Sequence, residues 1–146
     1  MSYKGKFRPT NRTKYKGDPD NIIYRSLWER QVMKDLDLNV NVVEWASEEI
    51  VIPYRSPIDG KMHRYFTDFY VKTSKGEKFL IEVKPKTQTK PPKKSKSRNR
   101  YLREMKSWGV NQAKWEAAQS ICDRHGWKWC IWTEDEIKPH KYMRNK

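Results

Sequence analysis

Two nearby runs of this sequence set its expected architecture: Phe66-Thr67-Asp68-Phe69-Tyr70-Val71 and Lys78-Phe79-Leu80-Ile81-Glu82-Val83-Lys84. Both are rich in apolar and aromatic residues, which is typical of β-strands. The polar turn Thr73-Ser74-Lys75-Gly76 between them indicates a hairpin, so we expect the two strands to be antiparallel neighbours. That pairing would bring Asp68 close to Glu82 without a long connection.

Side chains alternate between the two faces of a β-strand. Glu82 and Lys84 would therefore share a face with Leu80, while Ile81 and Val83 point into a core. A second carboxylate, from the neighbouring strand, would then lie beside this Glu-Val-Lys segment.

This combination of residue types predicts a particular chemistry. Two carboxylates held together repel each other unless a cation lies between them. Oxygen ligands suit Mg²⁺ or Mn²⁺, and an ammonium nearby can hold a water or a phosphate oxygen. Asp68, Glu82 and Lys84 therefore predict metal-dependent phosphodiester hydrolysis. The alternative is structural, because a Glu-x-Lys triplet on the exposed face of a strand is common by chance.

The net charge of +14 is concentrated in two segments. Residues 1–17 carry six Lys or Arg and residues 84–103 carry nine, with no acid in either, so the rest of the chain is close to neutral. This distribution is typical of proteins that bind nucleic acid through its phosphates. Basic segments can also serve solubility or bind acidic protein surfaces. Because the second segment begins at Lys84, we favour DNA as the partner.

The remaining composition argues against several other classes of protein. No run approaches the roughly 18 apolar residues of a membrane span, and the N-terminus lacks an apolar signal region. We therefore expect an intracellular protein with no membrane partner. Cys122 and Cys130 form no Cys-x-x-Cys pair, which argues against a zinc site. Neither a Ser/His/Asp arrangement nor a Gly-rich phosphate loop is present.

The two strands should belong to a larger mixed sheet. Asp59-Gly60 is a strong hairpin signal, so residues 50–55, 62–72 and 78–84 would form a three-stranded meander. Residues 127–133 alternate and are β-branched or aromatic. The helix expected before them favours a parallel pairing with 78–84 through a right-handed crossover.

Helices are expected on either side of this sheet region in the sequence. Apolar positions at helical spacing predict a helix within residues 22–38, for which Ser26 and Glu29 could be the N-cap and its capping-box partner. A short helix over 99–107 and a second helix over 111–125, which a glycine closes, are expected after the sheet.

A long basic connection precedes these last helices. Residues 85–98 contain three prolines, six Lys or Arg and almost no apolar residue, so we expect a mobile loop. Lys114 would lie near the N-terminus of the second helix, where free amides favour phosphate; a solvated surface lysine is the alternative. The expected organisation is a basic, extended N-terminal arm over 1–20, a nuclease domain over 21–137 and a basic C-terminal tail over 138–146.

Asp68, followed fourteen positions later by Glu82-Val83-Lys84, resembles the Pro-Asp…(Asp/Glu)-x-Lys motif of the PD-(D/E)XK nuclease superfamily. Thr67 stands where the motif has proline. Arg25-Ser26 followed by Glu29 resembles the Arg-Ser-x-x-Glu helix of phage Holliday-junction resolvases and of the endonuclease subunit of Tn7-type transposases. The resemblance implies a restriction-endonuclease-like α/β fold, in which a single domain has a mixed central sheet flanked by helices. It also implies a place for Glu29 in the metal site.

A closer likeness, to the head-completion nucleases of large tailed phages, runs along nearly the whole chain. The segments that resemble this family are Lys16-Gly17-Asp18-Pro19, Tyr24-Arg25-Ser26, Ile52-Pro53-Tyr54, Arg64-Tyr65-Phe66, Ile81-Glu82-Val83-Lys84-Pro85-Lys86 and Lys114-Trp115-Glu116-Ala117-Ala118-Gln119. The likeness implies a role in virion assembly, in which packaged DNA is trimmed or finished before the tail attaches. It implies phage head or portal proteins as partners, and the host cytoplasm and the virion as locations.

The expected activity is that of a Mg²⁺-dependent DNA endonuclease, with Mn²⁺ as the alternative ion. Asp68, Glu82 and the Val83 carbonyl would hold the metal, Glu29 would complete the site, and Lys84 would orient the attacking water. The residues expected to bind DNA phosphates without reading bases are Lys86, Lys90, Lys93, Lys94, Lys96, Arg98, Arg100 and Lys114. Two alternatives stay open: a non-catalytic DNA-binding head or portal component, and a structure-specific nuclease for junctions or transposon ends.

Overall fold

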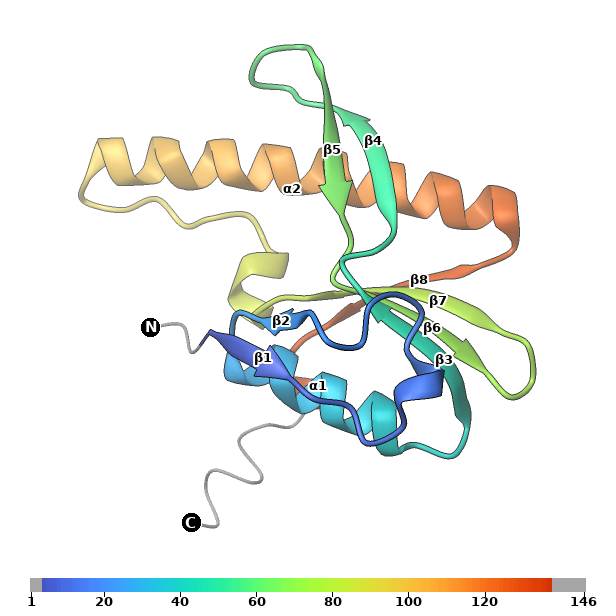
Figure 1. Cartoon of the computed structure of the whole chain (residues 1–146). Coiled ribbons are helices and arrows are strands. Elements are labelled where there is room, and N and C mark those ends of the chain that lie inside the picture. Colours follow the sequence, from blue (N-terminus) through green and yellow to red (C-terminus); the bar gives the residue numbers. More distant parts are fainter. Residues whose placement is uncertain (1–3, 138–146) are drawn as a thin grey trace.

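The computed structural model describes residues 4–137, so the predicted C-terminal tail 138–146 lies outside the described residues. A central sheet separates two helices, α1 on one side and α2 on the other, and a two-stranded hairpin stands out from it (Figure 1). In chain order, the elements are β1 (Gly5–Phe7), η1 (Arg12–Lys14, 3-10), β2 (Ile22–Tyr24), α1 (Leu27–Leu38), β3 (Val42–Ser47), β4 (Val51–Arg55), β5 (Met62–Phe66), β6 (Phe69–Thr73), β7 (Lys78–Val83), η2 (Lys86–Thr89, 3-10), α2 (Arg98–His125), β8 (Lys128–Trp132) and α3 (Glu134–Ile137).

The central sheet is mixed and has the strand order β3-β6-β7-β8. β6 and β7 are antiparallel, and β8 is parallel to β7, as the sequence predicted. Leu80 and Ile81 point to opposite faces of β7, yet their exposed fractions are 0% and 2%, because helices cover both faces. This confirms the predicted α/β architecture, a mixed sheet flanked by helices.

Thr67 and Asp68, between β5 and β6, form the connection at which the chain passes from the hairpin into the central sheet. The amide of Thr67 donates to the carbonyl of Ile50 at 3.1 Å, and the amide of Glu48 donates to the carbonyl of Asp68 at 3.2 Å. Glu48 adopts a left-handed backbone conformation with φ of 54° at this crossing. A proline at position 67, as in the superfamily motif, could not donate the first of these bonds.

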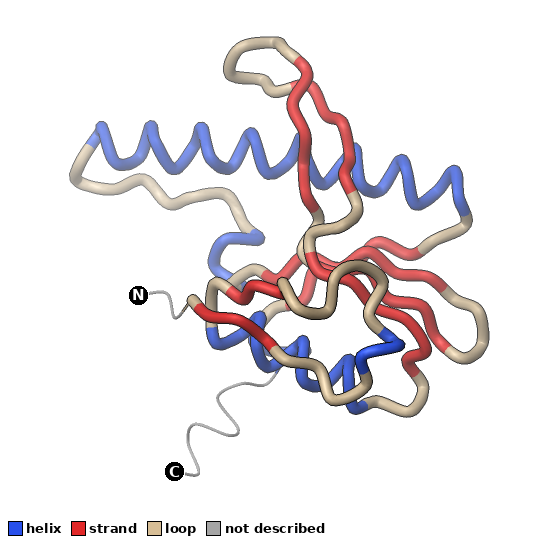
Figure 2. The backbone as a smooth tube through the Cα atoms, in the orientation of Figure 1, coloured by secondary structure: helices blue, strands red, loops and turns tan. Residues whose placement is uncertain are grey.

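Because of this break, the three-stranded meander is wrong. β5 pairs only with β4, in a separate two-stranded sheet, whereas β6 pairs with β3 and β7. The path of the backbone from the hairpin into the central sheet can be followed in Figure 2. The hairpin packs on α2, which supplies the apolar contacts that a free hairpin would lack.

The two helices predicted over 99–107 and 111–125 form one continuous helix, α2. The Ser97 side chain caps its start by accepting a hydrogen bond from the amide of Arg100 at 3.3 Å. Gly109 in a helix interior costs about 1 kcal/mol relative to alanine, and the buried face that α2 presents offsets that cost. Although α2 is 28 residues long, no helix among residues 4–137 is apolar enough over a sufficient length to cross a membrane.

The N-terminal segment is packed on the body, in contrast to the expected extended arm. β1 and β2 form an antiparallel pair, and the Asp37 carboxylate, at the end of α1, accepts hydrogen bonds from the amides of Thr10 at 2.8 Å and Asn11 at 3.2 Å. The ammonium of Lys14 donates to the carbonyl oxygens of Asp37 and Asn39, both at 2.8 Å. The segment therefore satisfies groups that the end of α1 leaves without partners.

The basic connection between β7 and α2 begins with η2 and continues without regular structure to Ser97. Its first residue after Pro85 is anchored, because the amide of Lys86 donates to the Glu134 carboxylate at 2.7 Å and its ammonium lies 3.0 Å from Asp135. The mobility of residues 85–98 stays a prediction.

Replacing Asp37 by alanine should lower the free energy of unfolding by about 1–3 kcal/mol. Its side chain is 1% exposed, and its loss leaves the Thr10 and Asn11 amides without an acceptor. Urea denaturation of the wild type and the variant measures the change. Asp35→Ala is the control, since Asp35 is exposed on the same helix and, within residues 4–137, its carboxylate accepts a hydrogen bond from the Gln31 side chain alone. Equal losses in the two variants would contradict this account of the N-terminal segment.

Candidate functional site

Asp68 lies directly before β6 and faces the end of β7. The antiparallel register pairs Phe69 with Ile81, so the next position along each strand pairs Asp68 with Glu82. The carboxylate of Asp68 accepts a hydrogen bond from the amide of Val83 at 2.7 Å. The structure therefore brings together the two carboxylates that the hairpin spacing predicted.

Burial and the neighbouring Glu82 carboxylate both disfavour the charged form of Asp68. Burial raises the pKa of Asp68 well above its usual range, and the neighbouring Glu82 raises it further. The Val83 amide and the Lys84 ammonium act in the opposite direction. In the absence of a cation, the pair is thus held in a state that favours binding a proton or another positive charge.

Glu82 is itself enclosed by donors. Its side chain is 9% exposed. One carboxylate oxygen accepts a hydrogen bond from the Tyr65 hydroxyl, and the other lies 3.4 Å from the ammonium of Lys84. Lys84 is half-buried and follows directly after the last residue of β7. The predicted Glu-Val-Lys group therefore does not lie on an exposed strand face, which removes the structural alternative based on chance exposure.

Glu29 occupies the first turn of α1. The Ser26 hydroxyl accepts from the Glu29 amide at 3.1 Å, so Ser26 is the N-cap, and the Glu29 carboxylate accepts from the Arg25 amide at 3.0 Å. Burial raises the pKa of Glu29, and the nearby Glu48 and Glu82 contribute to the increase. Glu29 thus has a capping role and also lies near the carboxylate pair.

The three acidic residues do not form one ready-made cluster. Within residues 4–137, no group of three or more His, Cys, Asp or Glu side chains is close enough to hold a metal ion. Asp68 and Glu82 are adjacent. Glu29 lies farther away, but its charge still contributes to the raised pKa of Asp68. The protein therefore offers a pair of carboxylates rather than a complete ligand set.

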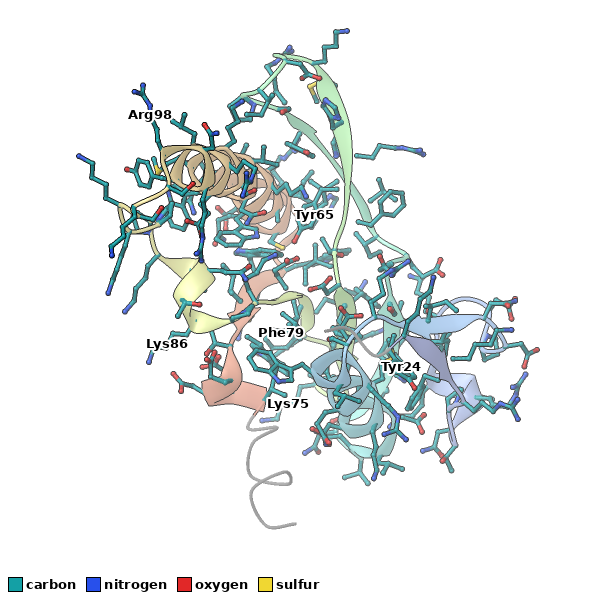
Figure 3. The ribbon with its side chains drawn as sticks, turned by 90° about the vertical axis from the view of Figure 1, so that its left-hand side faces the viewer. Tyr24, Tyr65, Lys75, Phe79, Lys86 and Arg98 are labelled. Carbon is teal, nitrogen blue, oxygen red and sulfur yellow. The ribbon has the colours of Figure 1, made fainter. Side chains whose placement is uncertain are left out.

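Tyr65 is a site residue that the sequence analysis did not identify. It comes from β5, on the hairpin, and its hydroxyl donates to Glu82 on β7. Figure 3 shows Tyr65 where the hairpin faces α2. Strand alternation in residues 62–66 indicates that Tyr65 has an inward side chain. It does not indicate that the hairpin folds back over the end of β7.

Lys114 reaches the same region, for a reason different from the predicted one. It lies in the interior of α2, so the helix N-terminus cannot be what makes it a phosphate site. Its ammonium lies 5.8 Å from the ring centroid of Tyr54 and 5.5 Å from that of Tyr65. Lys114 therefore lies beside Tyr65, the tyrosine whose hydroxyl donates to Glu82.

The other basic candidates lie apart from Lys114, on the connection to α2 and on its first turn. Figure 3 shows Lys86, on η2, and Arg98, at the start of α2. The exposed candidates of this basic segment are Lys86, Lys90, Lys93, Lys94, Lys96, Arg98 and Arg100. Since the segment starts at Lys84, it is continuous with the carboxylate site along the chain.

The mixed α/β sheet flanked by helices belongs to the restriction-endonuclease-like class of folds, and the paired carboxylates lie at neighbouring strand ends of that sheet. The family model described as "TnsA-like endonuclease N terminal" matches residues 39–134. The chain is also 44% identical over 143 residues to the head completion nuclease of Enterobacteria phage T4, covering 94% of this chain and 95% of that protein. The chain belongs to the TnsA-like endonuclease family, and these findings support a nuclease role. The matched region contains Asp68, Glu82 and Lys84 but begins after Glu29.

The repulsion at Asp68 predicts a pH-dependent effect on stability. The pKa of the Asp68 carboxyl is higher in the folded protein than in the unfolded chain, where it is about 4. Ionisation of this carboxyl therefore lowers the stability of the folded state progressively as the pH rises above about 4. In metal-free buffer, Asp68→Asn should therefore become more stable relative to the wild type as the pH increases, while its amide oxygen can still accept from Val83. Urea denaturation of both proteins at about pH 4 to 8, the range above the unfolded pKa, measures the difference in their free energies of unfolding.

Glu77→Gln is the matched control for this measurement. Glu77 is an exposed carboxylate whose pKa is lowered by its contact with Lys128, so this substitution should change relative stability in the opposite sense with pH. A constant difference between Asp68→Asn and the wild type at every pH would refute the account of the carboxylate pair.

Proposed function

We propose that this protein is a Mg²⁺-dependent DNA endonuclease that trims or finishes packaged DNA during phage head completion, before the tail attaches. The observation that carries the catalytic part is the contact between the half-buried Asp68 and the Glu82–Lys84 segment. The similarity to a phage head completion nuclease supports the biological part. Phage head or portal proteins would be its protein partners, and it would act in the host cytoplasm and at the virion.

The chemistry of the donor set supports a divalent ion. Asp68 and Glu82 supply hard oxygen donors, and their mutual repulsion would be relieved by a cation. Mg²⁺ commonly binds one or two carboxylates and keeps several waters, so two protein carboxylates and substrate phosphate would suffice. The Val83 carbonyl and Glu29 are the further ligands we propose. When bound, the ion would stabilise charge on the phosphate and lower the pKa of a water.

The surrounding side chains would position the reacting groups. Lys84, with its ammonium 3.4 Å from Glu82, would donate to the attacking water or to a phosphate oxygen. Tyr65 would hold one oxygen of Glu82 in a fixed orientation, and Lys114 would keep positive charge beside that tyrosine. The groups come from two strands and a helix, which are rigid elements suited to holding such a geometry.

The basic segment would hold the DNA backbone. Its residues from Lys90 to Arg100 are exposed cations that can contact phosphates without reading the base sequence. Each phosphate contact releases condensed counterions, so binding should weaken steeply as salt increases.

One alternative shares this chemistry and differs in substrate. The match to the TnsA-like endonuclease family favours a structure-specific nuclease that acts on junctions or transposon ends. Cleavage of linear, single-stranded, flapped and four-way DNA by the same preparation would distinguish this alternative from a nuclease that trims linear ends.

Asp68→Asn, Glu82→Gln and Lys84→Ala should each reduce DNA cleavage in Mg²⁺ by at least about a hundredfold, because each removes a group that acts on the transition state. The two carboxylate variants should also lose the increase in melting temperature that Mg²⁺ gives the wild type. Binding to DNA, measured by gel shift, should remain in the two carboxylate variants, since neither change alters the basic segment. Glu77→Gln, on an exposed turn, should cleave at the wild-type rate. Full cleavage by both carboxylate variants would refute the proposed active site. The alternative would then be that the protein is a non-catalytic DNA-binding component of the head.

Tyr65→Phe should reduce the cleavage rate roughly tenfold and raise the Mg²⁺ concentration needed for half-maximal activity. The change removes a hydrogen bond to a charged group but keeps the ring beneath Lys114. Tyr54→Phe is the matched control, because its ring lies beneath the same ammonium and its hydroxyl donates to no carboxylate in the described part of the chain. If both variants behave alike in a Mg²⁺ titration, Tyr65 does not position Glu82.

A further inference from the structure

The β4–β5 hairpin has two unlike faces. Residues directly opposite each other in an antiparallel pair share a face, and the face alternates along each strand. The inward face, which packs toward α2, includes Ile52, Tyr54 and Tyr65, with exposed fractions of 1%, 8% and 5%. The outward face consists of the pairs Val51 with Phe66, Pro53 with Arg64 and Arg55 with Met62, and all six residues are exposed.

The outward face combines apolar surface with positive charge. Val51, Met62 and Phe66 have exposed fractions of 42%, 55% and 42%, and no acidic residue belongs to the face. The guanidinium of Arg64 lies 5.6 Å from the centroid of the Phe66 ring. Exposed apolar patches on this scale are typical of surfaces that bind a partner, and the two arginines favour an anionic one.

This face adjoins the carboxylate site. β5 ends at Phe66, and Asp68 follows two residues later. Two residues of extended chain span at most about 7 Å, so the Phe66 ring is anchored within roughly one nucleotide spacing of Asp68. A polynucleotide whose phosphate lies at Asp68 and Glu82 would therefore have a neighbouring nucleotide within reach of Phe66.

We propose that the end of this face nearest Asp68, formed by Phe66 and Arg64, binds unpaired nucleotides next to the phosphate that is cut, and that the Arg55–Met62 end of the hairpin takes no part. Phe66 stacks on a base, and Arg64 contacts the adjoining phosphate. In an intact duplex the faces of the bases are covered by their neighbours, so an aromatic side chain stacks there only by paying to unstack a base step, whereas an unpaired or terminal base offers a free face. The inference rests on the proposed nuclease function and refines its substrate to DNA with a single-stranded stretch or end at the cut.

The test measures DNA binding separately from cleavage, in a Glu82→Gln background. Fluorescence anisotropy gives the Kd for a labelled single strand, for a duplex of the same sequence and for a duplex with a single-stranded overhang. Phe66→Ala should weaken binding to the single strand and to the overhang about tenfold, and binding to the blunt duplex less than about twofold. Phe66→Tyr should restore affinity, whereas Phe66→Leu should not.

Met62→Ala is the matched control, because it truncates an exposed apolar side chain on the same face and strand, farther from Asp68. It should leave the Kd for each DNA unchanged. An equal loss of affinity for the single strand and the blunt duplex, or no loss for either, would overturn the proposal. A change in oligomeric state on Phe66→Ala, with DNA affinity unchanged, would instead assign the face to contacts between copies of the chain. None of these outcomes depends on whether the wild type cleaves DNA.

Discussion

The burial of two like charges side by side, at Asp68 and Glu82, is the constraint around which much of this structure is arranged. Removing a carboxylate from water costs several kcal/mol unless donors replace the lost hydration. Here the donors are a strand amide, a tyrosine hydroxyl and an ammonium, from Val83, Tyr65 and Lys84. Repulsion at Asp68 persists despite them. A fixed, incompletely neutralised pair of carboxylates is a preorganised site for a cation.

The break in the chain between β5 and β6 makes this arrangement possible. If the strand had continued, Tyr65 would have stayed within the central sheet, and the hairpin would have extended the sheet. Because the chain turns out at Thr67, the hairpin packs on α2 and brings a tyrosine hydroxyl over the end of β7. The same turn leaves the opposite face of the hairpin exposed, with Phe66 only two residues from Asp68.

The continuity of α2 joins the two basic parts of the molecule. Its first turn carries Arg98 and Arg100, and its interior carries Lys114 beside the tyrosines. A break near Gly109 would have allowed these parts to move independently. Packing of Trp115, Ala118 and Cys122 keeps the second half of the helix against the body, so the exposed first half projects from a fixed base.

The sequence by itself determined the local elements and the pairing on which the site depends. Apolar runs and the turn between them were sufficient to predict that β6 and β7 are neighbours and that Asp68 meets Glu82, because a hairpin leaves little freedom of register. Residues 127–133 were likewise predicted to form a strand parallel to residues 78–84, and β8 confirms that pairing.

The tertiary structure decided what depends on contacts distant in the sequence. It separated β5 from β6, merged two expected helices through Gly109, and packed residues 4–20 against the end of α1, where Asp37 accepts their amides. It also chose Tyr65 as the partner of Glu82. Local propensities carry no information about these contacts, since each is stabilised by burial that exists only after the distant elements have met.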